Sequence, residues 1–454
     1  MAVKAFTNHV KGSHVSWRDL FGDNNMKTPL LRKDNVEDSM NIIFVNTSSS
    51  KEVIGGGDIR LLGLLYTLSN LRSKKIKLYL LSDKHYIESI RYWLYKSNLV
   101  KGNNNIPLSD DFALKISSYL PPYKRVSFII RLILLLLTSI RNLTNRGRII
   151  RRSIIVINNN QLYQYIIPGL DVLSNGMVVY IQTPPFNGDS NFIKTLMYRG
   201  FLPLLRLIGK FKRIIIFVFN PIDFVFLNTY FREEKNIKIV ITTNGVFKYF
   251  VNYNSVQKVY DVIYIGRLDP SKGSFKNFIT FLRNLAERNL NIRAAIITSC
   301  LKEELPYIER SLSGIKQYNN VKVEVLVNKT PIEVYRIISR SRALVMLSTL
   351  DVFNLAILES LVHGIHVIAL NNPRIETAYE RICDIFECKP LLQERFHIVD
   401  NIDEAVKEYL SVTEKERQVN EHVRVHALRL AQFLDWRYVV LKEVMEVVKW
   451  VYRK

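Results

Sequence analysis

Asp261-Val-Ile-Tyr-Ile-Gly-Arg-Leu-Asp-Pro-Ser-Lys-Gly273 is the stretch of sequence from which the fold prediction starts. Its apolar beginning predicts a β-strand that ends at Gly266, and Gly273 precedes a segment with helical periodicity. Two cations, Arg267 and Lys272, lie between the glycines. Glycine allows close backbone approach, a guanidinium can bind two phosphate oxygens, and a helix N-terminus presents free N–H groups. The stretch therefore predicts an anion-binding loop, with a surface turn carrying two solvated cations as the alternative.

Residues 348–370 form a second informative segment. Their pattern predicts a polar turn, a helix over residues 355–362 that stops at Gly364, and a short buried strand. Asp351 lies in the turn, and Glu359 lies one turn inside the helix. Ligands of such β-α-β units bind at the carboxyl ends of the strands. We therefore expect both segments to open onto the same edge of one sheet, where carboxylates can accept hydrogen bonds from sugar hydroxyls.

Together these residues resemble family 4 of the retaining glycosyltransferases, which have the two-domain GT-B architecture. In that family a Gly-Arg-Leu-x-x-x-Lys-Gly segment binds the donor diphosphate. An acidic pair separated by seven residues also binds the donor, the first acid at the sugar and the second at the ribose. The matching positions are Gly266, Arg267, Leu268, Lys272, Gly273, Asp351 and Glu359. The resemblance covers roughly residue 40 to the C-terminus.

The turn before the second helix departs from the family pattern. Its acid is Asp351 rather than the usual Glu, and Val352 and Asn354 stand where glycines normally flank the family's Phe. The donor-binding residues that the resemblance implies here are Gly266, Arg267, Lys272, Asp351, Phe353, Asn354, Leu355 and Glu359. Those that it implies for catalysis are Arg267, Lys272 and Asp351.

The chain has 454 residues, of which 48% are hydrophobic, so it is long enough for two cores. Apolar strands alternate with amphipathic helices in both halves, which predicts α/β parallel sheets covered on both faces. The resemblance implies two Rossmann-like domains facing a cleft and a C-terminal helix that crosses back to the first. The predicted units are a poorly structured extension (1–39), an acceptor-side domain (40–245), a nucleotide-sugar domain (246–432) and a crossover helix (433–454).

Two features of the first half are candidate site residues. A glycine run lies between a strand and an apolar helix, and it is either a flexible loop or the counterpart of a glycine-rich loop that the family carries there. In the second case Gly56 and Gly57 approach the bound donor and acceptor. Gln182 stands near the place where lipid-linked-oligosaccharide mannosyltransferases of the family often carry a His, so we assign it to the acceptor side. An amide can hydrogen-bond but cannot shuttle protons at neutral pH.

The net charge of +23 is concentrated in the first half. Residues 124–152 contain eight Lys/Arg and no acid, and residues 192–213 contain six more and no acid. The apolar run between Arg131 and Arg141 would rise only about 14 Å as a helix, against a hydrocarbon core of about 30 Å. These basic, apolar segments predict interfacial helices on an anionic membrane; a buried helix with solvated ends is the alternative for residues 126–140. Nucleic acid would need the same charge, but aromatic stacking platforms and recognition motifs are missing, so we expect no nucleic-acid partner.

The remaining signals concern compartment and metals. No N-terminal stretch has the pattern of a signal peptide, and the cysteines at positions 300, 383 and 388 predict neither a metal site nor a disulfide framework. We expect a cytoplasmic protein, peripheral on the inner face of the cell membrane. No Asp-x-Asp occurs in the sequence, which fits a metal-free site, and no cofactor is expected.

The resemblance thus implies a retaining hexosyltransferase, which we expect to be metal-independent. Its donor is a nucleotide diphosphate sugar, and its acceptor is a hydroxyl of a lipid-linked glycan or glycolipid. Two alternatives from other classes remain: a catalytically weak sugar-nucleotide-binding homologue and a basic nucleic-acid-binding protein.

Overall fold

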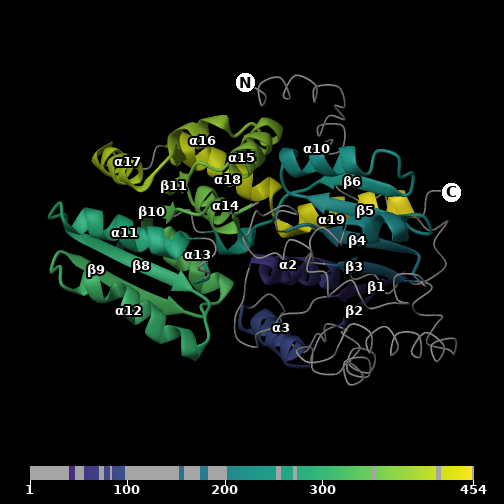
Figure 1. Cartoon of the computed structure of the whole chain (residues 1–454), viewed down its shortest axis with the longest axis horizontal. Helices are drawn as coiled ribbons and strands as arrows, with labels where there is room; N and C mark the ends of the chain where they lie inside the picture. Colours follow the sequence, from purple (N-terminus) through teal and green to yellow (C-terminus); the bar gives the residue numbers. More distant parts are fainter. Residues whose placement is uncertain are drawn as a thin grey trace. The chain divides into compact units, whose positions relative to one another are not determined.

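The fold is taken from a computed structural model of the whole chain (Figure 1). The structure describes residues 40–45, 56–70, 76–81, 84–97, 153–157, 174–182, 202–251, 257–268, 273–349, 351, 353–415 and 421–451. Residues 1–39 lie outside the described ranges.

The first half of the chain contributes a six-stranded sheet in the order β2-β1-β3-β4-β5-β6. Every neighbouring pair in this sheet is parallel. The strands are β1 (Met40–Val45), β2 (Ile76–Leu81), β3 (Ser153–Ile157), β4 (Gly176–Tyr180), β5 (Arg213–Val218) and β6 (Ile237–Ile241). The central strands are runs of apolar residues: all five residues of β4 are buried, as expected for a sheet covered on both faces.

The second half contributes another six-stranded parallel sheet, in the order β12-β11-β10-β7-β8-β9. Its strands are β7 (Tyr260–Ile265), β8 (Ile292–Thr298), β9 (Val321–Val327), β10 (Ser341–Met346), β11 (His366–Leu370) and β12 (Phe396–Val399). In chain order this is the 3-2-1-4-5-6 arrangement of a Rossmann sheet. Such sheets bind ligands where the strand order reverses, which here is between β7 and β10.

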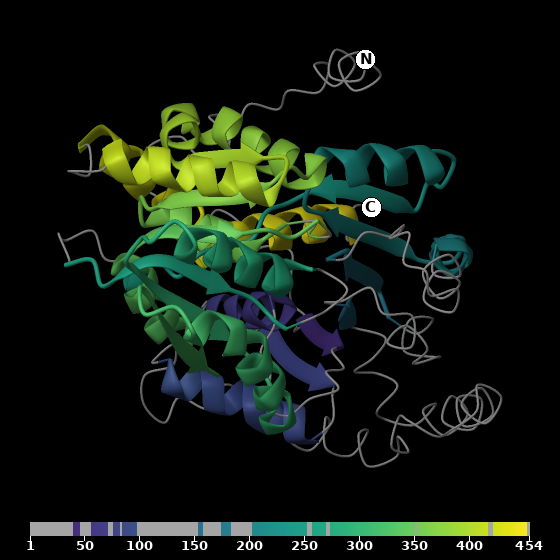
Figure 2. The same ribbon diagram turned by 60° about the vertical axis from the view of Figure 1, so that its left-hand side comes forward.

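Helices follow the strands in both halves, and Figure 2 shows them from a second direction. Among the described residues of the first half they are α2 (Gly56–Asn70), α3 (Lys84–Lys96) and α10 (Pro221–Tyr230). Those of the second half are α11 (Ser274–Ala286), α12 (Leu305–Lys316), α13 (Pro331–Ser339), α14 (Leu355–Val362), α15 (Pro373–Phe386), α16 (Lys389–Arg395), α17 (Ile402–Lys415) and α18 (Glu421–Phe433). Residues 202–209 are also helical. None of these described helices is long and apolar enough to cross a membrane.

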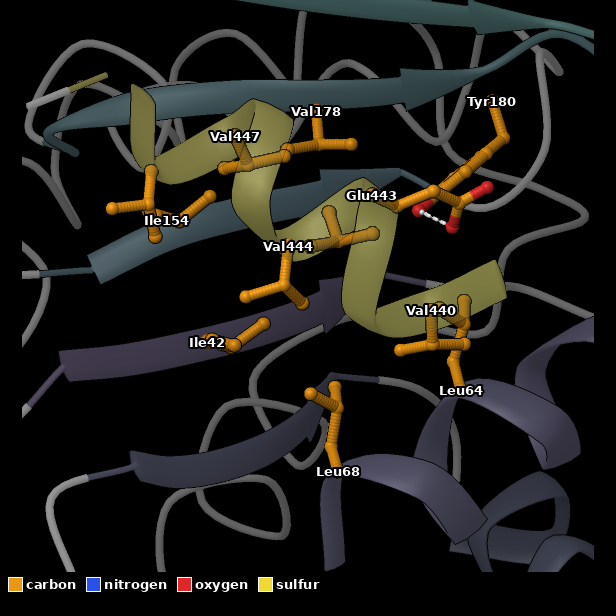
Figure 3. A pocket seen from close by; sticks show the side chains of 12 residues that line it. Ile42, Leu64, Leu68, Ile154, Val178, Tyr180, Val440, Glu443, Val444 and Val447 are labelled. Carbon is orange, nitrogen blue, oxygen red and sulfur yellow. Dashed lines mark hydrogen bonds between the residues drawn. The ribbon is translucent and has the colours of Figure 1, made fainter. Parts of the chain in front are cut away.

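The last helix, α19 (Trp436–Val451), returns to the first sheet, as predicted. It packs beside α2 and lies across β1, β3 and β4, whose side chains Ile42, Ile154 and Val178 point toward it (Figure 3). A largely apolar cavity of about 30 Å³ remains beneath the helix. At the C-terminal end of α19, the Arg213 side chain donates to the carbonyl oxygens of Trp450 (3.0 Å) and Val451 (3.3 Å). The C-terminal helix is therefore part of the first half's core.

The α/β prediction of two parallel sheets is confirmed, and several details differ. The crossover helix begins at Trp436 rather than at 433, because Leu434 and Asp435 pair with the backbone at Val246. The sequence pattern predicts no element between residues 371 and 432, where the structure has β12 and four helices. The interfacial helix expected at residues 126–140 lies outside the described ranges, as does the first part of the one expected at 192–208.

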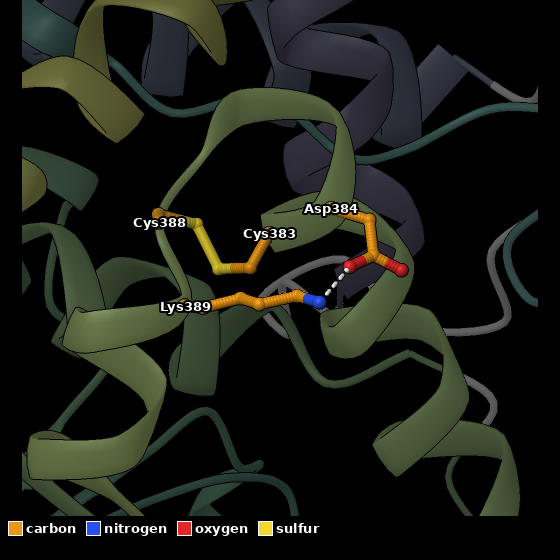
Figure 4. The surroundings of a disulfide bond; sticks show 4 residues. All are labelled: Cys383, Asp384, Cys388 and Lys389. Atoms are coloured by element: carbon orange, nitrogen blue, oxygen red, sulfur yellow. Dashed lines mark ion pairs between the residues drawn. A yellow bond between two sulfur atoms is a disulfide. The ribbon is translucent and has the colours of Figure 1, made fainter.

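The structure contains a disulfide that the sequence analysis did not expect. Cys383, near the end of α15, is bonded to Cys388 in the turn before α16 (Figure 4). Between them Glu387 adopts a left-handed backbone conformation (φ 55°), which turns the chain and brings the two Cα atoms to 4.4 Å. Two cysteines only five positions apart are thus joined by local chain reversal, whereas Cys300 is free and buried.

Candidate functional site

The loop after β7 is held by hydrogen-bond contacts of one buried tyrosine, Tyr264. The Tyr264 hydroxyl donates to the carbonyl oxygen of Arg267 (3.0 Å) and also lies 3.0 Å from the hydroxyl of Ser274. A Cβ at Gly266 would lie 2.7 Å from the Tyr264 hydroxyl oxygen, so only glycine fits above it. Gly273 precedes α11 with φ 64°, a conformation that favours glycine. Both glycines are therefore required by the loop, and the Arg267 side chain is exposed at its start.

The turn after β10 is organised by Asn354. Its side-chain oxygen accepts the N–H of Ala356 (3.0 Å) and caps α14, while its side-chain nitrogen donates to the Asp351 carboxylate (2.9 Å). The Asn372 side chain donates to the backbone carbonyl oxygen of Asp351 (2.9 Å). Asp351 is buried, and both its carboxylate and its backbone are held in place.

These two segments meet at the edge of the second sheet. β7 and β10 are neighbouring parallel strands, so the loops that follow them leave the same edge at the point where the strand order reverses. The Asn277 side chain lies in the first turn of α11. It donates to the carbonyl oxygen of Leu347, which is the first residue after β10 (3.0 Å). The Gly266–Arg267 loop and the Asp351 turn are thereby tied together.

Glu359 lies inside α14 and is 7% exposed. Burial raises the pKa of its carboxyl to about 8, although a hydrogen bond with Tyr335 acts in the opposite direction. The Tyr335 hydroxyl in turn accepts the N–H of Phe247 (3.1 Å), in the segment that leads from the first sheet to the second. A carboxyl that is protonated near neutral pH in the free protein can ionise when ligand hydroxyls hydrogen-bond to it.

The candidate residues of the first half lie at the carboxyl edge of its sheet. Gly56 and Gly57 are the first two residues of α2, the helix that follows β1, and Gln182 is half-buried two residues after β4. Phe353 of the second half packs on Phe219, just after β5, with ring centroids 6.0 Å apart. The Asp351 turn therefore lies against the same edge of the first sheet.

The sequence predicts the two loops but not the residues whose hydrogen bonds hold them in place. It does not indicate Tyr264, Asn277, Tyr335 or Asn372, because an isolated Tyr or Asn carries no signal of a bond to a distant backbone atom. Lys272 lies outside the described residues, so nothing is concluded about its position. Among the residues that the structure describes, no group of three or more His, Cys, Asp or Glu side chains is placed to hold a metal ion.

The second basic segment is partly structural. Arg206 donates to the carbonyl oxygen of Tyr230 (2.8 Å), Lys212 donates to that of Ser174 (2.6 Å), and Arg213 binds the end of α19 as described above. Leu207 and Phe211, by contrast, are 54% and 73% exposed, and Lys210 is exposed between them. We call residues 207, 210 and 211 the basic-apolar patch.

Comparison with known proteins agrees with this geometry. Residues 247–425 match the family model described as glycosyl transferases group 1. These residues include the Gly266–Arg267 loop, the Asp351 turn, helices α15, α16 and α17, and the start of α18. A comparison with curated protein sequences finds no match.

Solved structures with the same fold are distant in sequence. The pneumococcal O-GlcNAc transferase GtfA, in complex with UDP and GlcNAc, is 10% identical with a TM-score of 0.61, over 92% of this chain and 100% of that one. The Anabaena protein HepE, in complex with UDP and glucose, is 12% identical with a TM-score of 0.59, over 90% and 99%. Sucrose-phosphate synthase of Thermosynechococcus elongatus is 11% identical with a TM-score of 0.61, over 92% and 100%. The chain thus has the GT-B fold, and its residues 247–425 match the model of the group 1 glycosyltransferases.

Proposed function

We propose that the protein transfers a hexose from a nucleoside diphosphate sugar to a hydroxyl of a membrane-associated acceptor, with retention of configuration at the anomeric carbon. The acceptor is a lipid-linked glycan or a glycolipid. One observation carries the donor part of this proposal. The Gly266–Arg267 loop and the Asp351 turn leave neighbouring strands at the reversal point of a Rossmann sheet, joined by the bond from Asn277 to Leu347.

The reaction breaks the bond between the anomeric carbon and the β-phosphate oxygen. The acceptor oxygen forms a new bond to the same face of the sugar, and its proton passes to the departing diphosphate. The main electrostatic demand is the charge that develops on the diphosphate, and the exposed guanidinium of Arg267 is suited to it, with Lys272 as a second cation. Asp351, oriented by Asn354, binds the sugar, and Glu359 binds the ribose. The proposal requires no metal.

Nucleotide-sugar binding is the first test. A bound ligand stabilises the folded state by mass action, by about 2.7 kcal/mol at a hundred times its Kd. UDP-, GDP- and ADP-hexoses should therefore be screened for an increase in Tm, starting with UDP, which is present in the GtfA and HepE complexes. A positive result names the base of the donor. No shift with any of them would end the proposal.

Arg267→Ala should weaken nucleotide-sugar binding and lower turnover at least tenfold, about 1.4 kcal/mol, because the leaving diphosphate loses its cation. Arg288→Ala is the matched control, since Arg288 is an exposed arginine beyond the opposite end of α11. Equal kinetics in the two variants would remove Arg267 from the site. Donor binding without transfer to any acceptor would favour a catalytically weak homologue, an alternative suggested by the Asn354 side chain beside Asp351.

The membrane part of the proposal is supported by the basic-apolar patch. Leu207, in the last turn of the helix at residues 202–209, and Phe211, in the turn that follows it, project apolar side chains into solvent, with Lys210 next to them. Such a surface fits the head-group region of an anionic bilayer, where the rings and aliphatic chains enter the lipid and the cation stays outside. With a membrane-bound acceptor at this half, the protein would be a peripheral membrane protein.

Binding to liposomes tests this surface. A variant with Leu207→Gln and Phe211→Ser should co-sediment less with phosphatidylserine-containing vesicles, and Arg148, Arg151 and Arg152 changed to Gln should reduce binding further. Tyr249→Ser is the control, because Tyr249 is similarly exposed (66%) but lies near the start of the second half. Unchanged co-sedimentation of both multiple variants would remove the membrane from the proposal. Salt-sensitive binding to RNA or DNA without any response to nucleotide sugars would favour the nucleic-acid alternative.

A further inference from the structure

Arg60 lies one turn inside α2 and is completely buried. Its Nη1 donates to the carbonyl oxygen of Thr243 (3.0 Å) and to the side-chain oxygen of Asn244 (2.9 Å). Its Nη2 forms an ion pair with Glu443 of α19, which is 3% exposed. One side chain therefore joins α2, the segment that leaves the first sheet and the helix that returns to it.

The acidic partner of Arg60, Glu443, also accepts hydrogen bonds from two other side chains. The hydroxyl of Tyr180 donates to the other carboxylate oxygen of Glu443 (2.8 Å), and the hydroxyl of Thr242 donates to the first. The guanidinium lies over the rings of Tyr180 and Phe219, 4.3 and 4.9 Å from their centroids. Planar and directional contacts therefore fix the guanidinium on several sides.

The network lies where the chain passes twice between the two sheets. Val246, on the outward passage, donates to the carbonyl oxygen of Leu434 (2.7 Å), and Trp436, on the return, donates to that of Val246 (3.1 Å). The Trp436 ring fits between Gly63 of α2 and Gly245, where added Cβ atoms would lie 2.3 and 2.5 Å from it. Both passages and α2 are thus in contact at one place.

Stability alone does not explain a buried ion pair at this place. Removing two charges from water is costly, and well-packed apolar residues often stabilise a core as much or more. Apolar residues cannot, however, fix three segments by directional bonds. Gly56 is four residues before Arg60, about 6 Å along the helix axis, so the bonds of Arg60 also locate the first turn of α2.

We propose that Arg60 is a positioning residue that fixes the glycine-containing start of α2 against both passages between the sheets, and so holds Gly56 and Gly57 where donor and acceptor meet. The catalytic part of this inference rests on the proposed glycosyl transfer; the positioning part does not.

The test replaces the ion pair by neutral residues of similar size, Arg60→Met with Glu443→Gln, because either change alone would leave a buried charge without its partner. The glutamine keeps an oxygen for the Tyr180 or Thr242 hydroxyl. The first measurement is hydrogen–deuterium exchange of the full chain without ligand. Exchange in the first turn of α2 should become at least tenfold faster, while exchange in α11 stays unchanged.

The second measurement is transfer from the nucleotide sugar selected by the Tm screen. The double variant should have a kcat at least tenfold lower, with the Kd for the free nucleoside diphosphate of that donor within twofold of wild type, since Arg267 and Glu359 are untouched. The kcat of Arg60→Lys should lie between those of the wild type and the double variant, because an ammonium can pair with Glu443 but cannot also bind Thr243 and Asn244 in the same plane.

Lys238→Met with Glu446→Gln is the matched control, since this pair (2.7 Å) joins α19 to β6 away from the two passages. It should leave the exchange of α2 and kcat at wild-type values. Unchanged exchange in the first turn of α2, or wild-type kcat in the folded Arg60→Met double variant, would overturn the inference. If the wild type transfers no sugar while the exchange difference remains, the proposed function fails and the positioning of α2 stands.

Discussion

Asn354 connects the cap of a helix to the orientation of a candidate sugar-binding acid, because its one amide binds both Ala356 and Asp351. Asn354→Ala should therefore cost about 1 kcal/mol of stability through the lost cap. It should also lower the affinity for the nucleotide sugar about fivefold relative to its free nucleoside diphosphate, roughly 1 kcal/mol, because the Asp351 carboxylate loses a hydrogen bond. Calorimetric titration with both ligands measures this difference.

Thr330→Ala is the control for this prediction, since Thr330 caps α13 in the same way without contacting the site. It should reduce Tm by a similar amount and leave both affinities unchanged. If Asn354→Ala behaves identically to Thr330→Ala, the link between the cap and sugar binding is wrong.

Glu359 should make stability depend on pH. Its pKa is raised from 4.5 to about 8 by burial, so between these values the folded state holds a proton that the unfolded state has released. The free energy of unfolding should then fall as pH rises through this window, with a slope of at most about 1.4 kcal/mol per pH unit from this group. Glu359→Gln, which cannot ionise, should flatten the slope in urea unfolding at pH 5, 6.5 and 8.

The exposed Glu309 of α12 provides the comparison, and Glu309→Gln should retain the wild-type slope. A parallel pH dependence in wild type and Glu359→Gln would show that Glu359 is ionised in the free protein. Nucleotide-sugar affinity is the second readout, and it should fall in Glu359→Gln because ribose hydroxyls lose a carboxylate acceptor.

At the level of single residues, sequence could identify those whose role depends on near neighbours. The glycines and the arginine of the 261–273 stretch belong to a local motif, as does the spacing of Asp351 and Glu359. Arg60 follows a glycine run and resembles a surface residue. Its acidic partner is 383 positions away, a separation at which no pattern in the sequence indicates a contact.

Between elements, α2 and α19 pack closely at Gly63. Gly63→Ala would place a Cβ 2.3 Å from the Trp436 ring, so the two helices must separate. We expect a loss of about 1–3 kcal/mol, greater than the roughly 1 kcal/mol that alanine gains over glycine in a helix. Thermal unfolding measures the loss, and adding Trp436→Leu to Gly63→Ala should recover part of it.

Gly314→Ala is the matched substitution in α12, where the nearest atom to an added Cβ is the flexible end of Arg283, at 3.2 Å. It should raise Tm slightly. Destabilisation by both substitutions to the same extent would mean that the Trp436 contact is not responsible.

Secondary structure elements were predictable where the apolar pattern was strong. Ile- and Val-rich strands such as β5 and β11 are continuous buried runs, so they stand out without knowledge of their partners. The helices after β11 were missed because they carry many charges and pack through narrow apolar stripes, as α15 does with Ile375, Tyr379 and Ile382. The disulfide within this region depends on the backbone turn at Glu387, which no local residue preference indicates.

For the whole molecule, the first sheet depends on a helix from the other end of the chain. Val440, Val447 and Val451 of α19 are buried against the first half, each contributing about 1.5 kcal/mol or more. A chain that ends at Asp435 should lose hydrogen-exchange protection in β1, β3 and β4 and bind a hydrophobic dye, while β7 and β8 stay protected. A chain that lacks only residues 452–454 is the control and should match the full chain. Retained protection of the first sheet in the shorter chain would contradict this account.

The chain leaves the first half at Val246 and returns to it beside Asp435, so this half can be completed only late in translation. The ribosome releases the six strands of the first sheet well before it makes α19, so the half that is translated first remains incomplete until the second half has been made. During this interval the side chains of β1, β3 and β4 that α19 covers in the finished protein are exposed, and we expect chaperones to protect the nascent chain until its final helix emerges.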